Sequence, residues 1–338
     1  MTELHLLISD LLLPAEAAPM AGEGLSLSAL ETLLARAGRS SLPDDSMEAA
    51  LCRAFEVSGG AIAPIALQAD GISPLTHDWL RADPVYLSDQ RGHMVLYPEV
   101  FLQPDEAAQM CGDLNRHFAD GGIEFFAPHP TRWYVRLRET QQMQTVPPAR
   151  VANQRINAFL PQGTDALRWL SVANEIQMLF YEHPVNQARE ARGLVPVNSV
   201  WFWGGGRAVP LGGRYTEVWG DYPLAAAFAQ AAGLPYVELC DGAIPALPLN
   251  GRVLVVLNGM GLALQRGDLQ AWRSAVQQSE TYCQSWLSDL RAGRLKQLTL
   301  DAIRNDGTQR FVLLRTDAWK FWRKRRHLAQ YSLAAETV

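Results

Sequence analysis

The chain has 338 residues, of which 48% are hydrophobic and 19% are charged, so it can bury one large core or two modest ones. Its formal net charge of -5 argues against a protein that binds nucleic acid or membranes over its whole surface, because attraction to phosphate needs a basic excess. The four cysteines form no Cys-x-x-Cys pair, no segment resembles a signal peptide or a membrane span, and we therefore expect a cytoplasmic protein.

The N-terminal part of the chain predicts α/β elements with a polar residue at two of their ends. His5–Asp10 is a short apolar run that predicts a strand, with Asp10 at the carboxyl edge of a sheet. Apolar residues at helical spacing predict helices over Ser26–Ala37 and Met47–Phe55, the second starting after Ser46. Asp10 either caps a turn or contributes to a ligand site, and the sequence does not decide between them. For Ser46 we favour a helix cap over a nucleophile, because no nearby histidine would activate its hydroxyl.

The middle of the chain changes character and predicts a separate α+β unit. Between residues 84 and 137 the expected order of elements is strand, strand, helix, strand, strand. We therefore place an inserted α+β domain at 78–160 and an α/β core at 1–77 and 161–338.

After residue 167 strands and helices alternate, which predicts a mostly parallel sheet. The expected elements in this part are helix Trp169–Tyr181, strand Val200–Trp203, helix Tyr222–Ala232, strands Tyr236–Leu239 and Arg252–Leu257, helix Leu269–Leu290 and strand Phe311–Leu314.

The run from His183 to Gly206 orders polar residues in a way that packing alone does not require. It predicts a helix end at Gly193, a buried strand and then three glycines. Two arginines beside a strand that ends in glycines would make a bidentate clamp for an anion, but the same residues could also face solvent or pack in a core. The candidate anion-binding residues are Asn186, Arg189, Arg192, Asn198, Trp201, Trp203, Gly204, Gly205 and Gly206.

The spacing in this run carries a family resemblance. The matching pattern is Asn186-x-x-Arg189-x-x-x-Gly193-x-x-Pro196-x-Asn198-x-x-Trp201-x-Trp203-Gly204-x-Gly206. It is similar to a motif of the archaeal-type cofactor-independent phosphoglycerate mutases, and the chain resembles the RpfE-type regulatory proteins of bacteria more closely still. Weaker similarity extends from about residue 5 to about residue 290. The resemblance implies an α/β fold of the alkaline-phosphatase type, with a mostly parallel sheet, helices on both faces and a smaller inserted α+β domain.

The resemblance also implies a serine nucleophile and two divalent metals held by Asp and His. Ser46 stands at the nucleophile position, and Asp10 and Asp268 are what is left of the metal ligands. The histidines that the family carries after the strand ending at Leu257 and near its C-terminus have no counterpart here. A two-metal site cannot be assembled from these remnants by spacing, so we expect no cofactor.

Three functions follow as hypotheses. The first is a degenerate, phosphoglycerate-mutase-like protein that acts in regulation or binds a small anion, with a phosphorylated small molecule or a protein as partner. The second is an active 2,3-bisphosphoglycerate-independent phosphoglycerate mutase or phosphatase that uses Ser46 and Mn, Zn or Mg. The third is a protein-interaction module built on the basic segment Lys320–Arg326. We expect no membrane partner and, outside that segment, no nucleic acid.

Overall fold

The computed structural model describes residues 1–239 and 243–332. Its internal contacts divide the chain into two compact units, Met1–Phe55 with Gly212–Val338, and Glu56–Leu211. The expected core also included residues 56–77 and 161–211, which belong to the second unit in this division. Cys240 and the last six residues of the expected core, 333–338, lie outside the described residues. No described helix combines the length and the hydrophobicity that crossing a bilayer requires.

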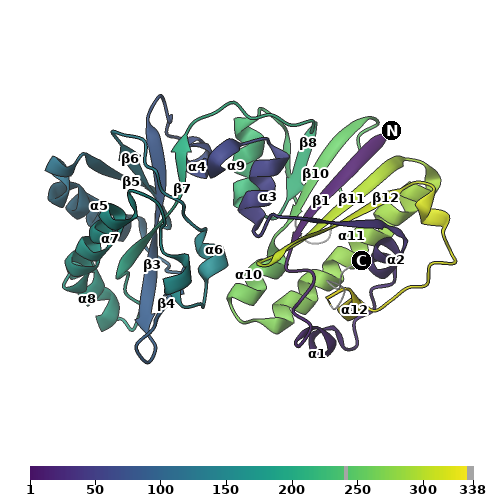
Figure 1. Cartoon of the computed structure of the whole chain (residues 1–338), viewed down its shortest axis with the longest axis horizontal. Coiled ribbons are helices and arrows are strands. Elements are labelled where there is room, and N and C mark those ends of the chain that lie inside the picture. The colour runs from purple at the N-terminus through teal and green to yellow at the C-terminus, as the bar shows by residue number, and fades with distance from the viewer. Residues whose placement is uncertain (240–242, 333–338) are drawn as a thin grey trace. The chain divides into compact units, whose positions relative to one another are not determined.

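A seven-stranded, mostly parallel sheet forms the centre of the first unit (Figure 1). Its strands are β1 (Thr2–Ser9), β2 (Gly38–Leu42), β8 (Glu217–Gly220), β9 (Tyr236–Glu238), β10 (Gly251–Leu257), β11 (Leu295–Arg304) and β12 (Gly307–Leu314). They lie in the order β2-β12-β11-β1-β10-β8-β9. The pairs from β11 to β9 are parallel, while β12 and β2 are added antiparallel at one edge. The expected mostly parallel sheet is therefore confirmed.

Helices cover both faces of this sheet. They are α1 (Ala18–Gly22), α2 (Ser28–Arg36), α3 (Met47–Ala54), α9 (Pro223–Ala231), α10 (Gly259–Gln265), α11 (Leu269–Ala292), the short turn η4 (Asp317–Trp319) and α12 (Ala329–Ser332). Side chains alternate along β1, and Leu4, Leu6 and Ile8 join the core that α2 and α11 cover. His5 points to the opposite face, where Arg53 of α3 shares a hydrogen-bond partner with it.

The second unit contains a smaller antiparallel sheet. Its strands are β3 (Asp78–Asp89), β4 (Met94–Tyr97), β5 (Ile123–His129), β6 (Arg132–Leu137) and β7 (Ser199–Arg207). The order is β4-β3-β6-β5, and β7 pairs with β3. The sequence placed Val200–Trp203 among the parallel strands, and that placement is wrong, because this segment runs antiparallel to β3 from Ser199 to Arg207. An isolated apolar strand does not reveal its partner from sequence, because any sheet can bury it.

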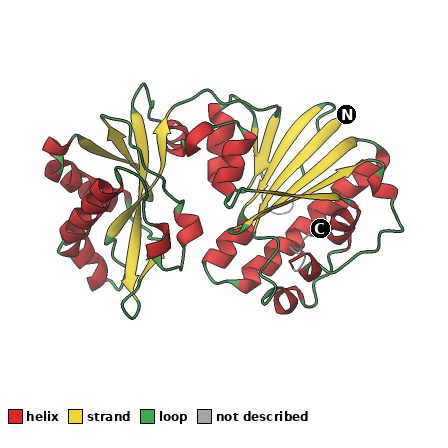
Figure 2. Ribbon diagram, in the orientation of Figure 1, coloured by secondary structure: helices red, strands yellow, loops and turns green. Residues whose placement is uncertain are grey.

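Three of the unit's longer helices lie together on one face of this sheet (Figure 2). The helices of the second unit are η1 (Ser58–Gly60), α4 (Ile62–Ala69), α5 (Pro104–His117), η2 (Ala119–Gly121), α6 (Pro148–Val151), η3 (Ile156–Phe159), α7 (Ala166–Tyr181) and α8 (Pro184–Ala191). Met110 of α5, Ile176 of α7 and Val185 of α8 bury their side chains against Val135 and Phe202 of the sheet. Contact with α5, α7 and α8 thus forms a second core, separate from that of the parallel sheet.

Candidate functional site

Two asparagines of the 183–206 run connect chain segments through their amide groups. Asn186, which is 3% exposed, donates from Nδ2 to the carbonyls of Phe180 and Val197 and accepts from the Val197 N–H at 2.9 Å. Asn198 forms a matching pair of 2.7 Å hydrogen bonds with the backbone N–H and C=O of Leu87. Both amides thereby satisfy backbone groups that β-pairing leaves open, which is a structural role.

The two arginines of the run converge on one carboxylate. Arg189 is 3% exposed and donates to Glu106 Oε2 at 2.7 Å and to the carbonyls of Phe101 and Val195. Arg192, half exposed, reaches the other oxygen of Glu106 at 2.5 Å. Burial alone would raise the pKa of Glu106, but the Gln103 N–H and both guanidiniums hold that pKa below its usual value. The two arginines that were expected to clamp an external anion therefore bind the carboxylate of Glu106.

The tryptophans and glycines of the run also have partners within the second unit. The indole N–H of Trp201 donates to the Val146 carbonyl at 2.8 Å, and that of Trp203 donates to buried Asp83 at 2.7 Å. A Cβ on Gly206 would lie 2.5 Å from the Cβ of Ala61, so this glycine permits a close approach between segments. A Cβ on Gly204 would likewise contact the side chain of Ile62 in α4, and a Cβ on Gly205 would contact that of Leu80 in β3. An anion site in this run stays a prediction.

In the first unit, Asp10 follows β1 at the carboxyl edge of the parallel sheet. Its φ of 50° lies in the left-handed region, which a residue other than glycine seldom adopts. Its N–H donates to Ile303 O at 2.8 Å and its carbonyl accepts from the Trp272 indole at 2.9 Å, so the backbone is held on both sides. Burial raises the pKa of the carboxyl group to about 6, an effect that the charge of Arg304 opposes.

A second carboxylate at the same edge, Asp221, escaped sequence analysis. It follows β8 and accepts hydrogen bonds from the N–H groups of Asn258 at 2.6 Å and Gly259 at 3.0 Å, where α10 begins. Burial raises the pKa of Asp221, although these two hydrogen bonds act in the opposite direction. The N-terminal amides of a helix normally attract anions. Here a side chain of the protein occupies two of them. The only sequence signal was the short strand before Asp221, which the expected elements omitted.

Ser46 lies at the N-terminus of α3, as expected for a cap. Its Oγ accepts a hydrogen bond from the Ala49 N–H at 3.1 Å, and its backbone is extended, as is usual for a cap residue. In the first turn of the same helix, Glu48 accepts a hydrogen bond from the Tyr222 hydroxyl at 2.7 Å. The expected helix cap is therefore present, and the nucleophile role stays a prediction.

Removal of this cap gives a first test. We expect Ser46→Ala to lower the free energy of unfolding by about 1 kcal/mol, because the Ala49 N–H loses its acceptor. Ser46→Asp keeps an acceptor oxygen and serves as the matched control, so its stability should stay near that of the wild type. Urea unfolding followed by circular dichroism measures both. An alanine variant as stable as the wild type would show that the cap contributes nothing.

The described residues do not fit a two-metal site. Asp268 caps α11, where its Oδ1 accepts from the Ala271 N–H at 2.8 Å. Across 1–239 and 243–332, no group of three or more His, Cys, Asp or Glu side chains is placed to hold a metal ion. The Asp10 carboxylate is a suitable ligand for a divalent metal. Such a metal needs several ligands in one place, and the described residues do not supply them beside Asp10.

A buried polar cluster on the sheet was also missed. We define the Asp301 cluster as His5, Arg53, Tyr215, Asp301 and Arg310. The Asp301 carboxylate, which is 0% exposed, accepts from Arg310 at 2.7 Å and from Arg53 and His5 at 2.9 Å. Burial lowers the pKa of His5, which favours the neutral ring. In the tautomer that suits both partners, Nε2 donates a hydrogen bond to Asp301 and Nδ1 accepts one from the Tyr215 hydroxyl. The alternation of apolar and polar residues along β11 was a usable signal for this strand.

The basic segment after η4 exposes aromatic as well as charged side chains. Phe321 is 81% exposed and Trp322 is 65% exposed. Arg323 donates to the carbonyls of Arg36 and Ala37, which fastens the segment to the end of α2. A role of this segment in binding a partner stays a prediction.

Comparison with curated proteins finds relatives of one kind. A segment of 129 residues is 30% identical to the 2,3-bisphosphoglycerate-independent phosphoglycerate mutase of Methanothrix thermoacetophila, covering 38% of this chain and 32% of that protein. A segment of 192 residues is 31% identical to the Geobacter sulfurreducens protein designated "Probable 2,3-bisphosphoglycerate-independent phosphoglycerate mutase", covering 53% and 48%. The mutase of Methanosarcina mazei is 24% identical over 184 residues, or 52% and 46%. The matches thus span about a third to a half of the length of these relatives, and no family model matches the chain.

Comparison with solved structures extends over nearly the whole chain. The PH0037 protein from Pyrococcus horikoshii has a TM-score of 0.50 at 11% identity and aligns with 98% of this chain and 92% of its own. The cofactor-independent phosphoglycerate mutase from Thermoplasma acidophilum has a TM-score of 0.47 at 11% identity, with coverages of 99% and 95%. The first of these structures shows a similar fold, and the matches to curated proteins relate the chain, at low identity and over part of its length, to the 2,3-bisphosphoglycerate-independent phosphoglycerate mutases.

Proposed function

We propose that this chain is a phosphoglycerate-mutase-like protein without the two-metal catalytic site, and that it acts by binding or regulation. In this proposal the protein has the fold of the mutases and is related to them, but it does not catalyse their phosphoryl transfer. We also propose, from the sequence resemblance, that the chain is more closely related to the RpfE-type regulatory proteins than to the mutases.

The carboxyl edge of the parallel sheet carries the proposal. Phosphoryl transfer needs an activated nucleophile and cations that offset the phosphate charge. At this edge the Ser46 hydroxyl accepts the Ala49 N–H, and the Asp221 carboxylate accepts two N–H groups at the start of α10. A phosphate bound at the start of α10 would be repelled by the Asp221 carboxylate, which already accepts the N–H groups that such a phosphate would need.

One observation favours the alternative, an active mutase or phosphatase. Asp10 combines a left-handed backbone with a partly buried carboxyl group of raised pKa at the sheet edge. Strain and perturbed pKa values of this kind gather at functional sites. In an active enzyme Asp10 would serve as a metal ligand, with Ser46 as the nucleophile.

Metal titration separates the two candidates. We expect isothermal titration calorimetry with Mn²⁺, Zn²⁺ or Co²⁺ to give weak heats without defined stoichiometry, because Asp10 lacks enough companion ligands among the described residues. Asp105→Asn, which alters an exposed carboxylate of α5, serves as the control for Asp10→Asn. Tight binding of one or two equivalents that Asp10→Asn abolishes and Asp105→Asn leaves intact would contradict the proposal and support a rebuilt metal site.

A further inference from the structure

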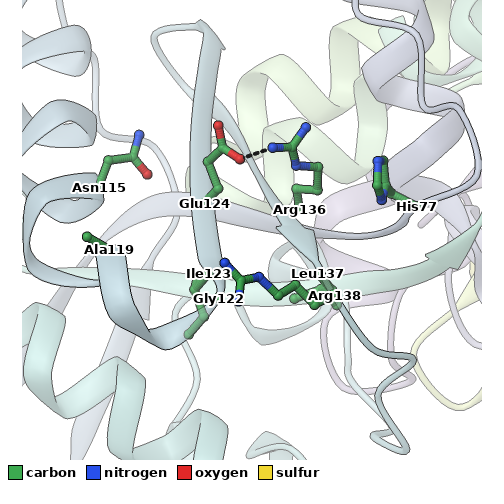
Figure 3. Close-up of a pocket in the computed structure, with 9 residues that line it drawn as sticks. All are labelled: His77, Asn115, Ala119, Gly122, Ile123, Glu124, Arg136, Leu137 and Arg138. Atoms are coloured by element: carbon green, nitrogen blue, oxygen red, sulfur yellow. Dashed lines mark hydrogen bonds and ion pairs between the residues drawn. The ribbon is translucent and has the colours of Figure 1, made fainter.

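A cavity of about 630 Å³ opens in the second unit, and none of the residues named for catalysis lines it. It lies where β5 begins and β6 ends, beside the C-terminal end of α5 (Figure 3). Its volume falls within the range of small-molecule sites. The lining residues are His77, Asn115, Ala119, Gly122, Ile123, Glu124, Arg136, Leu137 and Arg138.

Two arginines and one carboxylate set the charge of this cavity. Arg136 is paired with Glu124, and the two side chains are 40% and 46% exposed. Water screens an ion pair of that exposure strongly, so it holds the guanidinium only weakly and leaves further donors free. Arg138 is exposed, and none of the residues that the structure describes forms an ion pair with it. The cavity therefore presents an excess of one positive charge.

The Arg138 side chain occupies the space that a side chain at position 122 would need. Gly122 has a φ of 68°, and a Cβ there would lie 2.9 Å from Cδ and 3.1 Å from Nε of Arg138. The absence of a side chain thus allows Arg138 to lie along the backbone at the start of β5, as Figure 3 shows.

Two other residues of the cavity, Asn115 and Arg136, are held by contacts with β5. Asn115 forms two hydrogen bonds with the backbone of Phe125, accepting its N–H at 2.7 Å and donating to its carbonyl at 2.9 Å. The guanidinium of Arg136 lies over the ring of Phe126, 5.6 Å from the ring centroid, which orients it further. The ring contact restricts the orientation of the Arg136 guanidinium, and this lowers the ordering cost of binding.

We propose that this cavity binds a small organic oxyanion, with Arg138 and Arg136 as donors to its carboxylate or phosphoryl oxygens. Planar guanidinium groups match either oxyanion in bidentate fashion. The cavity is larger than one such group requires, which leaves room for the short carbon skeleton of an organic ligand. The site does not depend on Ser46, Asp10 or any metal, so it stands or falls independently of the proposed function.

Calorimetric titration of the full chain with inorganic phosphate and with succinate, at constant ionic strength, tests this site. We expect saturable binding of at least one probe, weakened about tenfold or more by Arg138→Gln because a charge-assisted contact is lost. Arg168→Gln, which removes an exposed arginine of α7 outside the cavity, should bind as the wild type does.

The two probes also identify the chemistry. Binding of phosphate alone assigns a phosphoryl ligand, binding of succinate alone assigns a carboxylate ligand, and binding of both supports the shared oxyanion chemistry. Absence of saturable binding by the wild type with both probes, or equal affinities of the Arg138→Gln and Arg168→Gln variants, would overturn the site. Thermal unfolding of each variant confirms that it is folded before titration.

Discussion

We expect Asp301→Asn to lower the free energy of unfolding by about 3 to 5 kcal/mol at neutral pH, because it removes the acceptor of a buried charge network. Asp301 is 0% exposed and accepts hydrogen bonds from Arg310, Arg53 and His5. An asparagine of the same shape would turn an NH₂ group toward these donors. The loss should appear in urea unfolding and as faster hydrogen exchange in β1 and β11.

The pH dependence of this effect has a definite sign. Burial alone would raise the pKa of Asp301, but hydrogen bonds from Arg310 and His5 hold that pKa well below its usual range. A lowered folded-state pKa contributes stability that is complete above the unfolded-state value of about 4 and is lost as the pH falls toward the folded-state value. The difference between wild type and Asp301→Asn should therefore shrink from pH 7 to pH 3. Asp306→Asn, at a 67% exposed partner of Arg304, should cost less than about 1 kcal/mol. A cost for Asp301→Asn as small as this control would contradict a stabilising cluster.

We expect Arg189→Ala to lower the free energy of unfolding by a similar amount, about 3 to 5 kcal/mol. The reason is that a buried carboxylate and two backbone carbonyls lose their hydrogen-bond donor. Arg189 is 3% exposed and joins Glu106 to the carbonyls of Phe101 and Val195. The matched control is Arg192→Ala, which removes the 52% exposed partner of the same carboxylate and should cost about 1 kcal/mol or less.

Phosphate distinguishes this structural role from an anion clamp. If Arg189 supports the fold, phosphate should shift the unfolding temperature of wild type and Arg189→Ala by equal amounts. A variant of unchanged stability that no longer responds to phosphate would establish the clamp and overturn the structural role.

The sequence predicted elements whose pattern is local and missed relations between distant residues. The strand at Arg252–Leu257, the helix from Leu269 and the cap at Ser46 were predictable, because apolar periodicity and capping chemistry are written within a few neighbouring residues. The strand at Val200–Trp203 was recognised, but its partner β3 lies more than a hundred residues away in the chain. No local pattern specifies such a partner.

Site residues show the same limit. The pattern Asn186, Arg189, Asn198 indicated particular polar contacts, and the contacts exist, but their partners are Val197, Glu106 and Leu87, which no spacing rule names. Asp221 follows a strand, and Asp301 occupies a strand, that the expected elements omitted, so neither the hydrogen bonds of Asp221 nor the burial of Asp301 could be foreseen. Burial and partner choice are properties of the packed chain.

The measurement that bears most directly on the proposed function is turnover of 3-phosphoglycerate by the purified chain with Mn²⁺, Zn²⁺, Co²⁺ or Mg²⁺, coupled to enolase. Ser46→Ala and the cap-preserving Ser46→Asp are assayed in parallel, so that a loss of activity can be separated from a loss of the helix cap. We expect no turnover by the wild type or either variant with any of these metals. Metal-dependent turnover by the wild type that both substitutions abolish would contradict this expectation and establish Ser46 as the nucleophile of an active mutase.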